Sequence, residues 1–175
     1  MVDPQRIPER SALLIVDAQR GSIDDGSETL RRIRELIADH RERFERVIAS
    51  RYINVEGSPV RVLLGSESWS DPRETALHDG IALPGVVVID KSTYALGELL
   101  QPHLDGIQNV VLCGVDTHAC VLHEALDAFD RCIRPIVLAE LCESGNGEDA
   151  HACALDVLRH AVGVHNVWEE ARERH

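Results

Sequence analysis

Short, unbroken apolar runs alternate with longer amphipathic stretches along this chain, and no other feature of the sequence restricts its fold as strongly. We expect the apolar runs to form strands over residues 11–19, 46–52, 85–91, 109–115, 134–140 and 164–168. Strands of continuous Val, Ile and Leu are covered on both faces, as in parallel sheets. Because such strands alternate here with helical segments, we predict a three-layer α-β-α fold with a doubly wound, six-stranded parallel sheet. The length is that of one domain, which we place over residues 1–175.

The spacing of apolar side chains predicts helices over residues 27–44, 95–104, 117–131 and 148–162. Ser27 is a suitable N-cap for the first helix, whose apolar positions extend to Phe44. The inner face of the third helix is expected to comprise Cys120, Val121, Ala125, Leu126 and Phe129. Residues 54–85 contain Gly, Pro and Ser and are harder to interpret. We expect a short helix near 59–65 and a surface loop over 68–80.

The acidic composition restricts the classes of partner. A formal net charge of -12 argues against binding to nucleic acid, which requires a basic surface, and against adsorption to an anionic membrane. No apolar run reaches the roughly 18 residues of a membrane span, and the N-terminal residues MVDPQRIPER lack the apolar core of a signal peptide. The five cysteines are widely spaced, odd in number and without a CxxC motif, which is typical of reduced thiols. We therefore expect a cytoplasmic protein.

Polar side chains follow the strands of the predicted sheet. In open parallel sheets, ligands bind beyond the carboxyl ends of the strands. Asp17 follows the first strand, Lys91 the third and Cys120 the fourth. Lys91 is the single lysine among 18 Lys and Arg residues, and a lysine is a compact charge whose pKa can be tuned, whereas an arginine is always protonated. A carboxylate, an ammonium and a thiol at one edge of a sheet suit nucleophilic catalysis.

Cys120 is the strongest candidate nucleophile. It lies at the start of a helix and near Lys91, so we expect its thiolate to have a lowered pKa. Asp17 would take the thiol proton and pass it to a leaving amine, and backbone N–H groups of residues 116–120 would hold an oxyanion. Taken alone, Cys120 is equally well interpreted as a small buried apolar residue, and Asp17 as the cap of a turn. The combination favours catalysis.

The histidines do not form a recognisable metal motif. A zinc site needs three or four converging ligands, and no HExxH, CxxC or HxH spacing is present. Neither a GxGxxG motif nor a P-loop occurs. We expect neither a metal nor an organic cofactor. The histidines in or next to the last two predicted helices are His118, His123, His151 and His160.

Five segments together resemble the isochorismatase-like cysteine hydrolases, the family that includes nicotinamidases, N-carbamoylsarcosine amidases and isochorismatases. The likeness extends from about residue 11 to 168, and the segments that carry it are ALLIVDAQ, VVIDKSTYAL, VVLCGVDTHACVLHEALDAFDR, PIVLAELCES and EDAHACALDVL. The resemblance implies a Rossmann-like strand order and a catalytic triad of Asp17, Lys91 and Cys120. It also implies a cis peptide between Val115 and Asp116, with the backbone N–H groups of Asp116 and Cys120 as the oxyanion hole. A dimer or tetramer, sometimes with a neighbouring subunit completing the pocket, is implied as well.

Departures from the family pattern bear on the substrate. The Asp-x-His metal motif of nicotinamidases is absent, since the segment at the end of the second strand is SRYINVEGS, and Asp116 stands where a small residue is frequent. An arginine in the pocket would pair with a substrate carboxylate. We predict that the pocket wall comprises Gln19, Arg20, Arg51, Trp69 and Tyr94.

The function that we predict is hydrolysis of a C–N bond, in an amide, carbamoyl or related group of a small molecule, through a thioester on Cys120. Three alternatives stay open. One is an isochorismatase-type hydrolase of an enol ether, and another is a non-catalytic binding protein with the same fold. The third is a redox protein in which Cys113 or Cys153 is the resolving partner of Cys120, although Cys113 lies inside a predicted strand.

Overall fold

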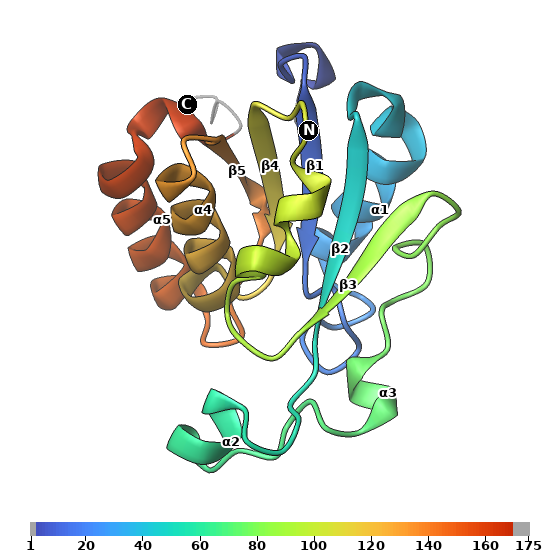
Figure 1. The fold of residues 1–175 in the computed structure, drawn as a ribbon, viewed down its shortest axis with the longest axis vertical. Helices are drawn as coiled ribbons and strands as arrows, with labels where there is room; N and C mark the ends of the chain where they lie inside the picture. The colour runs from blue at the N-terminus through green and yellow to red at the C-terminus, as the bar shows by residue number, and fades with distance from the viewer. Residues whose placement is uncertain (1–2, 170–175) are drawn as a thin grey trace.

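A parallel sheet forms the middle layer of the computed structural model, which describes residues 3–169 (Figure 1). Its six strands lie in the order β3-β2-β1-β4-β5-β6, and every neighbouring pair is parallel. The predicted three-layer α/β fold is therefore confirmed. The strands are β1 (Ser11–Val16), β2 (Arg46–Tyr52), β3 (Val86–Lys91), β4 (Asn109–Gly114), β5 (Arg134–Cys142) and β6 (Val167–Trp168).

Helices cover both faces of this sheet. One face packs against α1 (Glu28–His40), and the other packs against α4 (Leu122–Asp130) and α5 (Glu148–Val162) (Figure 1). Two short helices, α2 (Pro59–Leu64) and α3 (Pro72–Thr75), lie beyond the carboxyl ends of the strands, at the bottom of Figure 1. Within residues 3–169, no helix is both long and apolar enough to cross a bilayer.

Shorter helical turns connect these elements. A π-helical turn, Thr117–Val121, leads directly into α4 and contains Cys120. The 3-10 turns are Pro4–Arg6, Arg41–Arg43, Gly97–Leu99, Gln101–His103 and Val164–Asn166.

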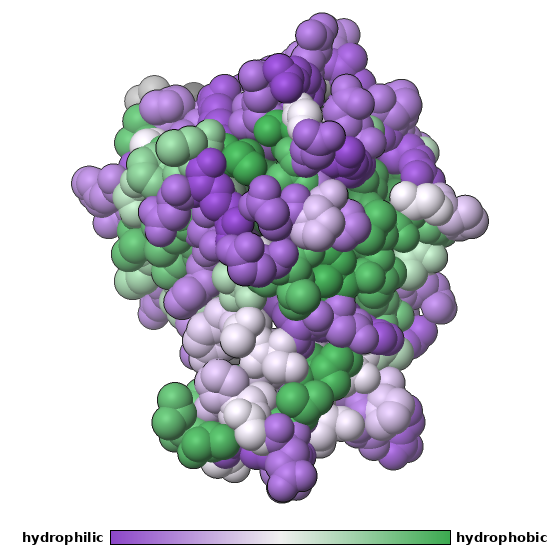
Figure 2. All heavy atoms as spheres, in the orientation of Figure 1, coloured by the Kyte–Doolittle hydropathy of each residue, from purple (hydrophilic) through white to green (hydrophobic). Residues whose placement is uncertain are grey.

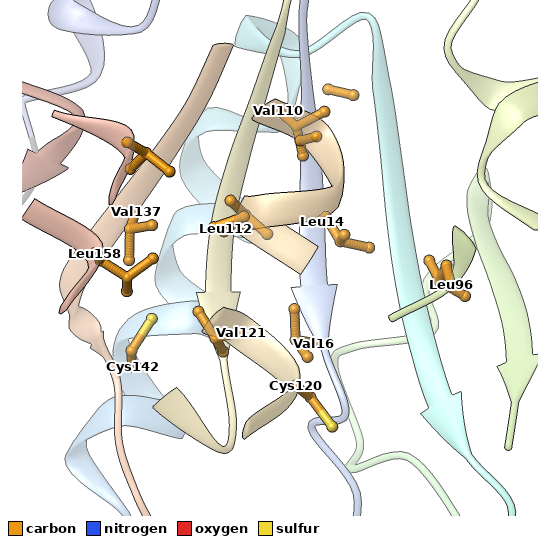
Figure 3. Close-up of a cluster of buried hydrophobic side chains, with 14 of the residues drawn as sticks. Leu14, Val16, Leu96, Val110, Leu112, Cys120, Val121, Val137, Cys142 and Leu158 are labelled. Atoms are coloured by element: carbon orange, nitrogen blue, oxygen red, sulfur yellow. The ribbon is translucent and has the colours of Figure 1, made fainter. Parts of the chain in front are cut away.

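The core consists of two apolar layers, because successive side chains of a strand point to opposite faces of the sheet. In β1, Leu14 and Val16 belong to the layer beneath α4 and α5, whereas Leu13 and Ile15 belong to the layer beneath α1. Figure 3 shows the first layer, in which Cys120 lies at the edge, beyond Val16. The apolar packing of this layer therefore extends to the carboxyl ends of the strands.

Two predicted helices are shorter than expected. The first ends at His40, so Phe44 is buried but lies outside it. Residues 95–104 form only two 3-10 turns. Gly97 has a φ of 55°, outside the range of a right-handed helix, and Pro102 has no N–H to donate.

Phe129 does not pack into the core as predicted, since it is 49% exposed. The inner face of α4 continues from Val121 at helical spacing and comprises Glu124, Ala125 and Ala128. Phe129 lies one residue, or about 100°, beyond this face. The carboxylate side chain of Glu124 therefore occupies a position on the inner face, for which only apolar residues were predicted.

Two other segments differ from the prediction. The segment 68–80, predicted as a surface loop, contains α3, which begins after Asp71. The Asp71 side chain accepts the N–H of Arg73 as an N-cap, and Pro72 suits the first turn. The last predicted strand, 164–168, is a 3-10 turn followed by the short β6.

Candidate active site

Asp17 directly follows β1 and is buried at the carboxyl ends of the strands. Its φ of 47° lies in the left-handed region, which Asp tolerates better than most side chains do. Ser50 in β2 fixes the carboxylate, because its Oγ donates to Asp17 Oδ1 at 2.7 Å and accepts the Asp17 N–H at 3.1 Å. A neighbouring strand therefore holds Asp17 in one orientation.

Lys91, the last residue of β3, has no exposed side-chain surface. Its Nζ lies 3.0 Å from Asp17 Oδ2 and 3.5 Å from Glu124 Oε1, and it donates to the carbonyl oxygen of Tyr94. Burial alone would lower the pKa of Lys91, but its interactions with the acidic groups of Asp17, Cys120 and Glu124 raise it above its ordinary value. Lys91 is therefore an ammonium ion held between two carboxyl groups.

Cys120 is the fourth residue of the π-helical turn and is 9% exposed. Burial and the Asp17 carboxylate raise the pKa of the Cys120 thiol well above its ordinary value, and Lys91 lowers it only in part. The predicted lowering of this pKa is therefore wrong, because desolvation and Asp17 outweigh Lys91. Cys120 rests as a thiol, and the charges of both Asp17 and Lys91 act on its sulfur.

Glu124 is a fourth ionisable group in this cluster, and it was not among the site residues predicted from the sequence. Its side chain is completely buried, and Oε1 accepts the Leu96 N–H at 2.9 Å. Burial raises the pKa of Glu124 to about 7, although Lys91 acts in the opposite direction. The sequence did contain a signal: Glu124 stands four residues after Cys120, on the same face of the helix.

A pocket of about 310 Å³ opens above this cluster. Asp17 and Cys120 contribute to its lining, together with the aromatic rings of Tyr52, Trp69 and Tyr94. The ring of Trp69 meets that of Tyr52 edge-on, with centroids 6.0 Å apart. The remaining lining residues are Ser22, Val60, Leu64, Ser66, Val115, Asp116, His118, Ala119 and Asn146.

Polar groups of one rim of the pocket come from the turn after β4. The Val115–Asp116 peptide is cis, as the resemblance implies. The Asp116 carboxylate accepts the Gly145 N–H at 2.6 Å, and His118 Nε2 lies 3.2 Å from Asn146 Nδ2. The loop after β5 therefore fixes this rim.

The structure places the predicted pocket-wall residues in two groups. Trp69 and Tyr94 line the pocket, whereas Gln19, Arg20 and Arg51 do not. Because parallel strands lie side by side, Arg51 in β2 pairs with Asp90 in β3, at 2.7 and 2.8 Å.

The other two residues of the second group are also engaged elsewhere. Arg20 lies 3.3 Å from Asp79. Gln19 is buried and links the end of β2 to Thr75. Its amide donates to the carbonyl oxygens of Tyr52 and Thr75 and accepts the Tyr52 N–H at 2.7 Å. Assigning these three residues to the pocket wall was therefore wrong. Tyr52, which does line the pocket, was missed although it is the last residue of a predicted strand.

Within residues 3–169, no three His, Cys, Asp or Glu side chains are grouped so as to hold a metal ion. His151 instead lies 2.8 Å from the hydroxyl of Thr117, bracing the turn that contains Cys120. Cys113 is buried in β4, and Cys153 is exposed on α5.

Sequence comparison relates most of the chain to one family. Residues 11–169 match the family model described as the isochorismatase domain. Isochorismatase domain-containing protein 2A of Mus musculus is 35% identical over 68 residues, which are 37% of this chain and 33% of that protein. Isochorismatase domain-containing protein 2 of Bos taurus is 35% identical over 78 residues, which are 43% and 38%. The matched segments thus span little more than a third of these curated relatives.

Solved structures share the whole fold at low sequence identity. A nicotinamidase from Bacillus subtilis has a TM-score of 0.76 and 18% identity, and the match covers 91% of this chain and 99% of that one. N-carbamoylsarcosine amidase from Thermoplasma acidophilum has a TM-score of 0.73 and 23% identity, covering 88% and 93%. At such identities the likeness concerns the fold, so the substrates of these enzymes do not transfer directly.

Proposed function

Because the chain belongs to the isochorismatase family of hydrolases, we propose that it cleaves a C–N bond of a small carboxamide or ureido compound through a thioester on Cys120. The observation that carries the proposal is the buried cluster in which the Lys91 ammonium lies 3.0 Å from the Asp17 carboxylate, both charges act on Cys120, and Asp17 and Cys120 line the same pocket. A thiol, a base and a cation that interact in one buried site satisfy the requirements of nucleophilic catalysis.

Asp17 acts as the base in the proposed first half-reaction. It removes the Sγ proton while the sulfur attacks the carbonyl carbon, and the π electron pair moves to the oxygen. Lys91 keeps its proton and stabilises the developing thiolate. The backbone N–H groups of Asp116 and Cys120 bind the oxyanion. The raised pKa of Cys120 makes this base necessary, because almost no thiolate forms without it.

The end of the first half-reaction and the whole of the second return the protons. Collapse of the tetrahedral intermediate breaks the C–N bond, and the proton on Asp17 moves to the departing nitrogen. Water then attacks the thioester, with Asp17 taking its proton and passing it to Sγ as the C–S bond breaks. A carboxylic acid leaves, or a carbamic acid where the substrate is a ureido compound, and the thiol is restored.

The charge of the pocket supports an uncharged or cationic substrate. Neither Arg nor Lys occurs among its lining residues, all of which lie within the described range, and Asp116 at the rim is acidic. A substrate carboxylate would therefore face Asp116 without a counter-charge. The charge argues against the enol-ether alternative, because isochorismate carries carboxylates. A volume of about 310 Å³ and the rings of Tyr52, Trp69 and Tyr94 suit a small planar group.

A homo-oligomer in the cytoplasm completes the proposal. Apolar side chains gather on α2, at the lower end of the molecule in Figure 2. Val62, Leu63 and Leu64 are 65%, 78% and 67% exposed, next to the mouth of the pocket. Burying this surface against a second copy would remove apolar area from water. Five free cysteines fit a reducing compartment.

The test compares the wild-type protein with Cys120→Ala on neutral carboxamides and ureido compounds, each matched with an analogue that bears a carboxylate. We expect the wild type to prefer the neutral member, and Cys120→Ala to lose about 10³-fold or more in kcat/KM. Cys153→Ala is the matched control, because Cys153 is exposed on α5, and it should stay within twofold of the wild type. Mass spectrometry of the quenched reaction should detect an acyl group on Cys120. Full activity of Cys120→Ala would reject the nucleophile.

A further inference from the structure

Glu124 lies in the reactive cluster, yet no step of the proposed mechanism uses it. The residue extends from α4 toward the end of β3, where Oε1 lies 3.5 Å from Lys91 Nζ and accepts the Leu96 N–H. The other oxygen, Oε2, is buried and has no hydrogen-bond partner among the described residues. Placing an ionised carboxylate with one unsatisfied oxygen in a buried site is costly, whereas a neutral acid costs much less.

The charges around Glu124 do not balance if both carboxyl groups are ionised. The charged groups that face it are Lys91 at the end of β3 and Asp17 directly after β1, and the segment after β3 contributes the backbone N–H of Leu96. Asp17 lies closer to the ammonium, at 3.0 Å, and Ser50 also binds it. One cation therefore serves two buried carboxyl groups, and Asp17 has the stronger contacts.

We propose that Glu124 is a positioning residue that keeps its proton in the active state, and that losing this proton to solvent base at higher pH suppresses formation of the Cys120 thiolate. The inference rests on the proposed role of Cys120 as nucleophile. While Glu124 is neutral, the Lys91 ammonium offsets the single negative charge that moves between Asp17 and Cys120. Once Glu124 ionises, the cluster carries an additional negative charge, and Lys91 is shared with a second anion.

The protonation behaviour of Glu124 supports this role. Burial raises the pKa of Glu124 to about 7, so the proton is held below neutral pH and lost above it. The charge of Glu124 hinders formation of the Cys120 thiolate least below about pH 7, where Glu124 is mostly protonated. This effect of Glu124 grows as the pH rises through that value.

The experiment measures alkylation of Cys120 by iodoacetamide between pH 5.5 and 9, with each cysteine quantified by mass spectrometry. Glu124→Gln keeps a neutral side chain that can accept the Leu96 N–H. We expect the ratio of Cys120 alkylation rates, variant over wild type, to be near one at pH 5.5 and to rise to about tenfold at pH 9, the order expected for one nearby charge in a partly screened site. The exposed Cys132 and Cys153 are internal controls, whose ratios should stay at one. A Cys120 ratio that does not change with pH would overturn the proposal.

A second measurement needs no variant. The infrared difference spectrum of the wild type between pH 6 and pH 8 should show the carbonyl band of a protonated carboxyl group disappearing. Ordinary carboxyl groups are already ionised over this range. Absence of the band would overturn the proposal even if Glu124→Gln failed to fold.

The two proposals can fail separately. If the alkylation ratio rises and the infrared band is found, but no amide is hydrolysed, then the inference about Glu124 stands and the hydrolase proposal fails. If amides are hydrolysed through Cys120 but the ratio stays constant, then Glu124 has only a structural role.

Discussion

The environment of Cys120 stabilises a buried thiol and not a preformed thiolate. The position at the start of a helix favours a negative charge, but burial and the Asp17 carboxylate are the larger effects. The helix position can be read from the sequence, whereas both larger effects depend on neighbours brought together by folding. Asp17 must therefore act on the proton of Cys120, and its contact with Ser50 keeps it in place.

The raised pKa of Glu124 also predicts how the stability of Glu124→Gln compares with that of the wild type. The folded-state pKa of Glu124 is about 7, against an ordinary 4.5, so its contribution to stability is fully present below pH 4.5 and is lost as the pH rises through 7. We expect the unfolding free energy of the wild type to fall by about 3 kcal/mol relative to that of the variant between pH 4.5 and 8. Urea denaturation of both proteins across this range measures the difference. A constant difference would show that the pKa of Glu124 is the same in the folded and the unfolded protein.

Gly114, the last residue of β4, is needed for the ends of two strands to meet at the site. Its φ is 117°, and a Cβ there would lie 2.1 Å from the carbonyl oxygen of Val16. Because Val16 precedes Asp17 and Gly114 precedes the cis peptide, this close backbone approach brings the ends of β1 and β4 together. Only glycine permits both the conformation and the contact.

We expect Gly114→Ala to lower the unfolding free energy by roughly 3 kcal/mol or more, since it adds a backbone clash to the conformational cost. Gly57→Ala is the matched control, because Gly57 also has a positive φ, 82°, but has open space around it. The control should cost about 1–2 kcal/mol. Chemical denaturation gives both values, and equal losses would show that the β1–β4 contact imposes no additional requirement.

Helix and strand boundaries were predictable where a local signal sets them. Ser27 caps α1 as expected, with its Oγ accepting the N–H groups of Thr29 and Leu30. The prediction failed at residues 95–104, where apolar periodicity suggested one helix, because Gly97 and Pro102 break the hydrogen-bonded pattern. It also failed at Phe129, since periodicity gives an apolar face only approximately and packing selects Ala128 instead.

At the scale of the whole molecule, the order β3-β2-β1-β4-β5-β6 places β1 between β2 and β4. Because these strands are all parallel, the carboxyl ends of β1, β4 and β3 lie on one side of the molecule, and the site forms beyond those ends. The exposed apolar helix α2 lies on this same side (Figures 1 and 2). An oligomer that covered α2 would thus also border the pocket.

We expect Leu63→Glu to lower the molecular mass measured in solution by light scattering, since Leu63 is 78% exposed on α2 and a charge there would oppose burial. Val157→Glu is the control, because Val157 is half-exposed on α5, on another surface. It should leave the mass unchanged. If the wild type is monomeric, or both variants keep the wild-type mass, α2 is not the contact between subunits.

The sequence by itself determined the layered fold and the positions of Asp17, Lys91 and Cys120 at one edge of the sheet. Continuous apolar strands require cover on both faces, and the carboxyl ends of parallel strands meet at one edge. Only the tertiary structure decided that Arg51 pairs with Asp90, that Glu124 shares Lys91 with Asp17, and that Cys120 rests as a thiol. The physical reason is that burial and charge act through space, between side chains whose separation in the sequence gives no indication of their distance in the folded protein.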